Sequence, residues 1–298
     1  MKKFSLCVIQ NILTVFTIIL LINCKPSSNS NLSNNNQVSN QTSISFSFNQ
    51  KQKSLVSAHR GGVGIKYFPE NCIETMQFLY EKGIQIFEID LAMTKDQKII
   101  LMHDNSLQRT STGLQDVNQV NLKKIKEYSL IDNFGNKTTY KIPTLKETLQ
   151  WAKNKNVYFM IDFKKDVPYE NVIAEIRKLH MEKRVILISY TLNQAKKLHN
   201  LAPEMYLSVP MKNEKEFTSM INSNINRDKM LAFTGTNRSP KSLHDKIHQE
   251  NIMVIFGTLG NIDKSAKARG NNIYQNLEDE GVDIFATDRA LEVFETLK

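Results

Sequence analysis

Short β-rich runs alternate with longer amphipathic stretches from Ser54 to the end of this 298-residue chain. Helical periodicity is clear in YENVIAEIRKLHME, where Val172, Ile176 and Leu179 recur at three-to-four spacing. Strands that alternate with helices predict a parallel sheet covered by those helices. The strand candidates are LVSAH, IQIFEID, KIILMH, VYFMIDF, RVILIS, MYLSV, MLAFTG, IMVIFGT and DIFAT.

The second and third candidates are predicted to form an antiparallel hairpin, because only LAMTKDQ separates them and a helical crossover needs more residues. The remaining pattern contains eight strand–helix units, as in a closed (β/α)8 TIM-type barrel. A doubly wound open sheet is the alternative, but no glycine-rich phosphate-binding motif opens the first helix. Residues 105–141 are polar and lack a clear strand. We expect them to form a small insertion after the second strand, near the top of the barrel, as a lid or substrate-shaping element.

The N-terminus carries two lysines followed by the apolar run FSLCVIQNILTVFTIILLIN. This pattern predicts a signal peptide at residues 1–23. An uncleaved membrane anchor is the alternative, because the run approaches the ~20 residues that span a bilayer. The tetrad LINC, which ends at Cys24, resembles the end of a bacterial lipoprotein signal, with Asn23 in place of the usual small residue. We therefore expect an exported protein, held on a membrane of the bacterial periplasm or cell envelope by a lipid on Cys24.

Residues 24–53 are dominated by Asn, Ser and Gln. Burial of so little apolar surface cannot offset the entropy that the chain would lose on ordering, so we predict a disordered tether there. The folded domain is predicted at residues 54–298. Removal of Cys7 with the signal peptide and lipidation of Cys24 would leave Cys72 without a partner. No disulfide framework is expected.

The net charge is +9, from 39 Lys and Arg against 30 Asp and Glu. The lysines are scattered, which indicates a solvated basic surface. Such a surface also suits anionic lipid headgroups or a substrate that carries phosphate. No basic stripe interleaved with aromatic residues is present in the sequence, so nucleic acid is not an expected partner.

Acidic residues follow two of the predicted strands. Glu88 and Asp90 are two apart in IQIFEID, so both point to one side of the strand while the other side is apolar. They could form a solvent-facing pair, but on a barrel strand the apolar side packs beneath the helices and the carboxylates face the barrel mouth. Carboxylates this close repel unless one is protonated or a cation lies between them. Asp162 and Lys164 repeat the spacing, and hard oxygen ligands favour Mg²⁺ or Ca²⁺.

Two histidines also end predicted strands: His59, followed by Arg60, and His103. A single histidine at a strand end is most often structural, but two beside a carboxylate cluster indicate catalysis. Imidazoles titrate near neutral pH and can serve as general base and general acid. Arg60 and Lys164 suit the oxygens of a phosphate. The other histidines are expected at the surface: His180, His199, His244 and His248.

The segments AHRGG, PEN and FEIDLAMTKDQKIILMHDNSLQRTSTG resemble the signature of the glycerophosphodiester phosphodiesterase family, within the phosphatidylinositol phospholipase C-like superfamily. The later segments IPTLKETL, MIDFK and GVDIFATDRA resemble that family's downstream motifs, so the resemblance extends from about Ser54 to about Ala290. It implies a TIM-type barrel. It also implies hydrolysis of glycerophosphodiesters to an alcohol and glycerol 3-phosphate, with Ca²⁺ or Mg²⁺ as cofactor.

The resemblance also implies roles for particular residues. They are His59 and His103 as the acid/base pair, Glu88, Asp90 and Asp162 as metal ligands, Arg60 and Lys164 as phosphate-binding residues, and Glu70 of the PEN segment as an additional candidate. Three features depart from the family pattern, and the first is Cys72, which stands where the family commonly has Thr. Asp162 stands where the family commonly has Glu, and VIFGTLGNIDKSAKARG replaces a tryptophan-bearing segment, so the wall that selects the alcohol is unusual.

Two other functions remain open. A phospholipase of the related phosphatidylinositol phospholipase C and sphingomyelinase D groups would act on intact membrane lipids with the same kind of barrel. A binding lipoprotein with an inactive barrel belongs to a different class, but it would have no need to keep both histidines, three carboxylates and both cations. The complete set of motifs favours a glycerophosphodiester as substrate.

Overall fold

The computed structural model of the chain describes residues 43–50 and 52–298. Their strands are β1 Leu55–Ala58, β2 Ile86–Met93, β3 Ile99–Leu101, β4 Tyr158–Phe163, β5 Val185–Ile188, β6 Tyr206–Pro210, β7 Met230–Phe233, β8 Met253–Gly257 and β9 Ile284–Thr287. Their helices are α1 Ile73–Glu81, α2 Leu122–Ile125, α3 Leu145–Ala152, α4 Tyr169–Lys178, α5 Leu192–Leu201, α6 Glu214–Ile221, α7 Lys241–Gln249, α8 Asn261–Arg269, α9 Asn272–Asp279 and α10 Ala290–Thr296.

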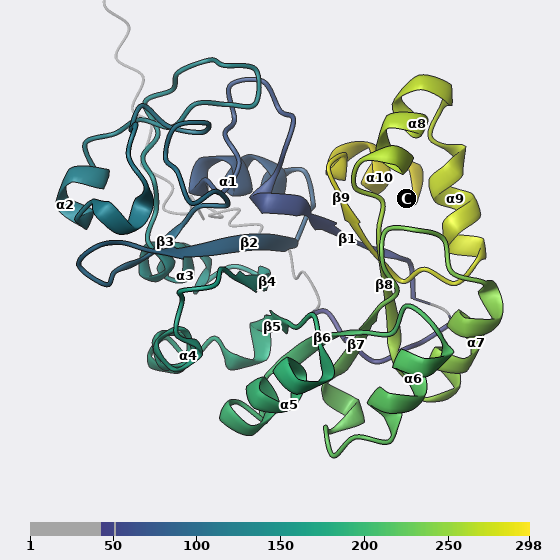
Figure 1. Cartoon of the computed structure of the whole chain (residues 1–298). Helices are drawn as coiled ribbons and strands as arrows, with labels where there is room; N and C mark the ends of the chain where they lie inside the picture. The colour runs from purple at the N-terminus through teal and green to yellow at the C-terminus, as the bar shows by residue number, and fades with distance from the viewer. Residues whose placement is uncertain (1–42, 51) are drawn as a thin grey trace, which may run out of the picture. The chain divides into compact units, whose positions relative to one another are not determined.

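The parallel strands form a closed ring. Their order is β1-β9-β8-β7-β6-β5-β4-β2, and the ring closes because β1 pairs with β2 as well as with β9. Figure 1 shows the strands at the centre of the barrel with helices around them. The antiparallel pairing of β2 with β3 confirms the predicted hairpin. The predicted (β/α)8 barrel is confirmed.

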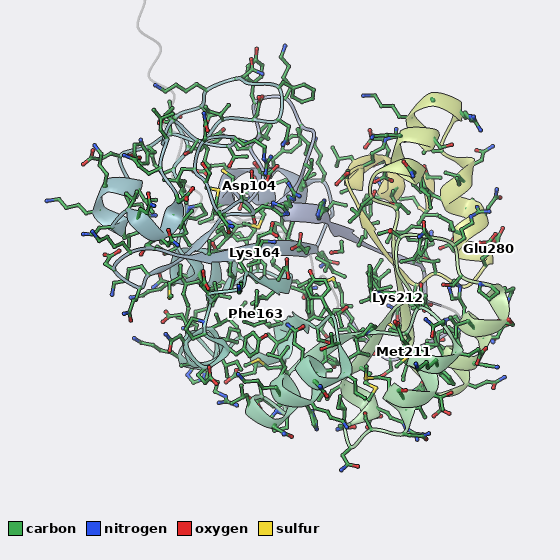
Figure 2. The ribbon with its side chains drawn as sticks, in the orientation of Figure 1. Asp104, Phe163, Lys164, Met211, Lys212 and Glu280 are labelled. Atoms are coloured by element: carbon green, nitrogen blue, oxygen red, sulfur yellow. The ribbon has the colours of Figure 1, made fainter. Side chains whose placement is uncertain are left out.

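Alternate residues of the strands face opposite sides of the barrel wall. The outward-facing side chains pack beneath the helices in the largest apolar core, which includes the fully buried Phe87, Phe159 and Phe285. Figure 2 shows side chains filling the space between strands and helices. Inward-facing residues such as Ile86 and Met160 form a second core inside the ring. Strands buried on both faces are rich in Val, Ile, Leu and Phe, which explains why the sequence pattern identified them.

Residues 43–50 pack at the amino-terminal end of the barrel. Phe46 is 3% exposed and contacts the first residues of two strands, with ring centroids 5.3 Å from Tyr158 and 5.1 Å from Tyr206. The backbone N–H of Ile44 donates a hydrogen bond to the Tyr158 hydroxyl at 2.9 Å. The prediction of a disordered tether up to residue 53 is therefore wrong for residues 43–50. The prediction rested on the polar composition of the segment and overlooked the alternating apolar side chains of ISFSF. These side chains pack against the amino-terminal end of the barrel.

The predicted signal peptide at residues 1–23, the predicted lipidation site Cys24 and the predicted tether up to residue 42 lie outside the described residues. Within the residues that are described, no helix has the length and apolar character that crossing a membrane requires.

The segment 105–141 packs over β3 around a small apolar core of its own. Leu107, Val117, Ile125 and Leu130 are buried there. Isolated bridges such as Ser111 to Leu130 hold its loops together in place of a continuous sheet. The segment follows the hairpin, so its loops lie near the carboxyl ends of the barrel strands.

His244 corrects one expectation from the sequence. It lies on the inner face of α7, between Leu243 and Ile247, and is 2% exposed. Its Nδ1 is 2.8 Å from the carbonyl oxygen of Glu280. Burial lowers the pKa of His244, so this histidine is a neutral core residue and not a surface one.

Candidate active site

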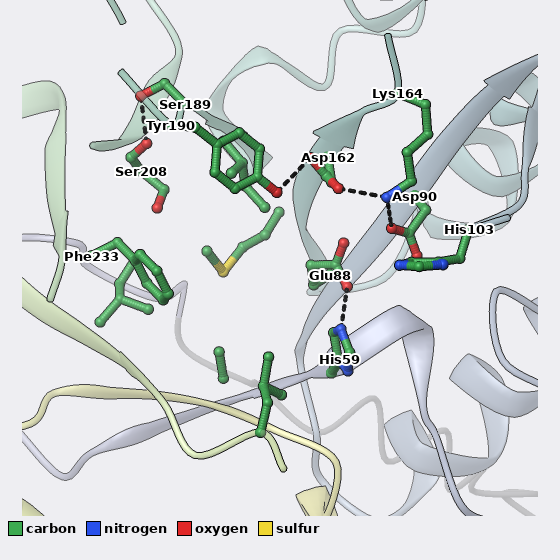
Figure 3. A pocket seen from close by; sticks show the side chains of 15 residues that line it. His59, Glu88, Asp90, His103, Asp162, Lys164, Ser189, Tyr190, Ser208 and Phe233 are labelled. Atoms are coloured by element: carbon green, nitrogen blue, oxygen red, sulfur yellow. Dashed lines mark hydrogen bonds and ion pairs between the residues drawn. The ribbon is translucent and has the colours of Figure 1, made fainter. Parts of the chain in front are cut away.

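A cavity of about 240 Å³ lies at the carboxyl ends of the barrel strands. One side of it is lined by acidic residues of β2 and β4, by Lys164 after β4 and by histidines that follow β1 and β3, as Figure 3 shows. The other side is apolar and is formed by Met160, Ile188, Phe233, Ile255, Leu259 and Ala286. In barrels of this type the carboxyl ends of the strands carry the chemistry.

Three buried carboxylates form the charged side. The pairing of β2 with β4 sets Asp90 directly beside Asp162, and Glu88 lies two residues earlier on the same face of β2. One oxygen from each lies within 4.8 Å of one from each of the others. Lys164 bonds to two of them, with Nζ 2.7 Å from Asp90 and 2.8 Å from Asp162. Burial, followed by the charge of Asp90, raises the pKa of Glu88 well above its ordinary value.

This donor set fits a divalent cation. Its oxygens are hard ligands of the kind that Mg²⁺ and Ca²⁺ take. Lys164 supplies one positive charge against three carboxylates, and burial together with the remaining repulsion raises the pKa of Glu88. A bound divalent cation would relieve that repulsion and stabilise all three groups in their ionised form.

The segment after β1 orients two of these carboxylates. The backbone N–H of Arg60 donates to Glu88 Oε2 at 2.7 Å, and Asn71 Nδ2 donates to Asp90 Oδ2 at 2.8 Å. Arg60 and Asn71 both have φ near +51°, in the left-handed region. Between them, Gly62 has φ +125°, and a Cβ there would lie 2.7 Å from Leu79 Cδ1. The glycines of HRGG therefore permit a turn that brings both donors to the carboxylates.

His59 is held by a carboxylate at the end of β9. Its Nδ1 is 2.6 Å from Asp288 Oδ1, while its Nε2 lies 4.0 Å from Glu88 Oε2. Asp288 is itself fixed, because its backbone N–H donates to the buried Asp263 at 2.8 Å. An Nδ1–H bonded to Asp288 leaves the Nε2 lone pair directed toward the cavity.

His103 is oriented in the same way by its neighbour in the chain. Its Nδ1 is 2.6 Å from Asp104 Oδ1, and Arg109 bonds to both oxygens of Asp104. The Arg109 hydrogen bond holds the pKa of Asp104 well below its ordinary value, so this group stays ionised. The Nε2 of His103 accepts a hydrogen bond from Arg60 Nη2 at 2.8 Å. A guanidinium can only donate, so this contact uses the lone pair of Nε2.

Glu70 anchors the two arginines. It is 2% exposed, and its oxygens accept from Arg60 Nη1 at 3.2 Å and from Arg109 at 2.7 and 2.9 Å. Asn133 of the 105–141 segment adds a hydrogen bond at 2.7 Å. Burial alone would raise the pKa of Glu70, but these donors outweigh it and lower the pKa. Glu70 therefore fixes the position of the Arg60 guanidinium and does not itself line the cavity.

The barrel brings the candidate residues of the sequence to one place. Glu88, Asp90, Asp162, Lys164, His59 and His103 line the cavity, and Arg60 contacts His103 from the side. Sequence reasoning placed Asp288 at the end of the last strand without giving it a role, and it gave no role to four other partners that orient these residues: Asn71, Asp104, Arg109 and Tyr190. Asp104 and Asn71 lie inside the motifs HD and PEN. Tyr190 and Asp288 follow strand ends, so the rule that chemistry gathers at carboxyl ends was the available signal.

Comparisons with known proteins agree with this geometry. Residues 59–290 match the profile of the family described as "Glycerophosphoryl diester phosphodiesterase family". A glycerophosphodiester phosphodiesterase of Bacillus subtilis is 31% identical over 221 residues, which cover 67% of this chain and 72% of that protein. One from Caldanaerobacter subterraneus is 30% identical over 163 residues, or 53% of this chain and 66% of that protein. A crystal structure of a glycerophosphoryl diester phosphodiesterase from Parabacteroides distasonis aligns with TM-score 0.79 and 31% identity, covering 84% of this chain and 88% of that one.

Proposed function

Because the chain belongs to the glycerophosphoryl diester phosphodiesterase family, we propose that it hydrolyses glycerophosphodiesters with a divalent cation and two histidines. Water adds across a P–O bond, and the products are an alcohol and glycerol 3-phosphate. The observation that carries this proposal is the single cavity that holds three buried carboxylates and two histidines, each histidine backed by its own carboxylate.

Glu88, Asp90 and Asp162 would hold the cation. When bound, it would draw charge from the phosphate oxygens and so make the phosphorus easier to attack. Lys164 and Arg60 lie beside this position and would bind the remaining anionic oxygen of the diester. The cavity's apolar side would then face one of the two substituents of the phosphate.

The two histidines differ in what faces Nε2. His59 Nε2 is directed toward the cavity and suits a general base that takes a proton from the attacking oxygen. His103 Nε2 is occupied by Arg60. A phosphate that draws Arg60 onto its oxygens frees this nitrogen to take up a proton from solvent water, which it passes to the leaving alkoxide as the P–O bond breaks. His59 is therefore assigned as base and His103 as acid.

The test is an assay of glycerophosphocholine, glycerophosphoinositol and intact phosphatidylcholine, each with added divalent cation or with excess chelator. We expect glycerol 3-phosphate from the first two substrates, only when cation is present. Full activity in chelator, with metal-free protein confirmed by elemental analysis, would overturn the metal assignment. Cleavage of intact phosphatidylcholine alone would establish the phospholipase function instead.

We also propose that the protein is exported and held on a membrane through lipidated Cys24, on the evidence of the apolar run and LINC. Mass spectrometry of the mature N-terminus tests this. We expect a diacylated peptide that starts at Cys24. An intact 1–23 segment, or an unmodified N-terminus elsewhere, would overturn it.

A further inference from the structure

We propose that Tyr190 is a positioning residue that holds Asp162 in the orientation in which it binds the cation. The inference rests on the metal-dependent function proposed for this cavity. It concerns a side chain from β5–α5, a loop that none of the sequence motifs includes.

Each of the three carboxylates accepts a hydrogen bond from a neutral donor of its own. Glu88 has the backbone N–H of Arg60 and Asp90 has the amide of Asn71. The third donor is the hydroxyl of Tyr190, which lies 2.9 Å from Asp162 Oδ1 (Figure 3). The other oxygen of Asp162 accepts from Lys164 at 2.8 Å. A carboxylate has about four lone-pair sites, so Asp162 can keep both bonds and still offer an oxygen to a cation.

The loop fixes the Tyr190 backbone from both sides. Ser189 bonds to the carbonyl of Ser208 through both its N–H, at 2.9 Å, and its hydroxyl, at 2.8 Å. On the other side, Gln194 Oε1 accepts from the Tyr190 N–H at 2.9 Å, and Thr191 Oγ1 accepts from the Gln194 N–H at 3.1 Å. Thr191 therefore caps α5, and the Gln194 side chain ties Tyr190, the residue before the cap, to the first turn of that helix. The phenol therefore projects from a rigid loop terminus and not from a mobile one.

The phenol can act only as a donor toward Asp162. An ionised carboxylate has no hydrogen to donate, so in the 2.9 Å contact the hydroxyl of Tyr190 donates and Asp162 Oδ1 accepts. Tyr190 is nevertheless 55% exposed, because its ring edge forms part of the cavity mouth. Removing only the hydroxyl should therefore spare the fold and leave Lys164 as the remaining partner that orients Asp162. An Asp162 carboxylate free to turn toward Lys164 is a poorer ligand.

The experiment measures cation affinity directly, by calorimetric titration of the metal-free protein with Mg²⁺, Ca²⁺ and Mn²⁺. Partners that orient metal ligands typically contribute 10–100-fold to affinity, and we expect Tyr190→Phe to weaken binding by that range. Tyr67→Phe is the matched control. Tyr67 is 54% exposed, and its hydroxyl makes no hydrogen bond to any other described residue, so binding should not change.

A double-mutant cycle tests whether Tyr190 acts through Asp162. Asp162→Glu adds one methylene and moves the carboxylate away from the Tyr190 hydroxyl. In that background Tyr190→Phe should change cation affinity by less than about threefold. An unchanged 10–100-fold loss would show that Tyr190 does not act through Asp162 and would overturn the inference.

Turnover gives a further readout. At low cation concentration Tyr190→Phe should be slow, and saturating cation should restore kcat with little change in KM. A raised KM at every cation concentration would mean that Tyr190 contacts substrate instead, which overturns the inference. Unchanged cation affinity in Tyr190→Phe overturns it while the proposed function stands. A wild-type protein that binds none of the three cations overturns both.

Discussion

Replacing Glu88 by Gln should stabilise the metal-free protein and at the same time abolish its response to cation. Two unit charges 4.8 Å apart repel by about 3.5 kcal/mol at an effective dielectric constant of about 20. Glu88 is repelled by two carboxylates and attracted by one ammonium, that of Lys164. The repulsion by about one carboxylate is therefore left uncompensated. Uptake of a proton limits this cost, so we expect a gain of about 2 kcal/mol. The amide oxygen can still accept from the Arg60 N–H.

The assay is thermal unfolding followed by circular dichroism, in chelator and then with cation. For a domain of this size about 1 kcal/mol corresponds to about 2–4 °C, so Glu88→Gln should raise Tm by about 4–8 °C in chelator. Cation at about 100 times its Kd should stabilise the wild type by about 2.7 kcal/mol, or about 5–11 °C, and should leave the variant within about 1 °C. Glu170→Gln, at an exposed carboxylate that begins α4, is the control and should change stability by less than about 0.5 kcal/mol.

The dependence on pH gives a second check. A carboxyl group whose folded pKa is raised binds more protons in the folded state, so stability is lost as pH rises from the unfolded value, about 4.3, through the folded one. The advantage of Glu88→Gln should therefore be near zero at pH 4 and complete at neutral and alkaline pH. A variant less stable than the wild type in chelator, or an advantage that does not vary with pH, would refute the reasoning.

Substitutions at four further residues test other parts of the site. His59→Ala and His103→Ala should each lower kcat by ~10²–10⁴-fold without unfolding the protein, and the double variant should lose much less than the product. With a nitrophenyl leaving group the acid becomes dispensable, so His103→Ala should recover activity and His59→Ala should not. Asp162→Ala should abolish cation-dependent turnover, whereas Asp162→Glu should keep it, as chelation and re-addition of metal would reveal. Glu70→Gln should cost about 3 kcal/mol at pH 7, measured by urea unfolding. That cost should shrink as pH falls below the carboxyl's unfolded pKa, because the stabilisation from a lowered folded pKa is complete above the unfolded value and is lost as pH falls through the folded one.

The barrel could be predicted because its strands are long apolar runs and its helices are periodic, so local pattern and global fold agree. The candidate ligands could also be predicted, because side chains along β2 and β4 alternate between the inside and the outside of the barrel with a period of two. The segment at residues 43–50 could not be located from composition. Its three apolar side chains are too few to offset ordering on their own, and they pack only because the closed ring already offers an apolar end.

The roles of the partners that orient the site were missed for a different reason. Asp288 contacts His59 because β9 pairs with β1, and Tyr190 reaches Asp162 across neighbouring strands. Such contacts depend on which strands are adjacent and on how loops turn, and neither is encoded in a local pattern. Arg60 needed both. Its charge suggested phosphate, but its pairing with Glu70 and His103 follows from the left-handed turn that it occupies.

The place of the cavity bears on the choice of substrate. It lies at the carboxyl ends of the strands and is lined on one side by charged groups. A soluble diester can diffuse into it from solution, whereas an intact lipid must bring its headgroup out of the bilayer and into the cavity. We therefore expect the lipidated protein in vesicles to cleave added glycerophosphocholine within about twofold of the rate of unlipidated protein, and to leave the vesicle's phosphatidylcholine intact. Release of choline-containing products from the vesicle lipid, at a rate near that for glycerophosphocholine, would contradict this argument and favour the phospholipase.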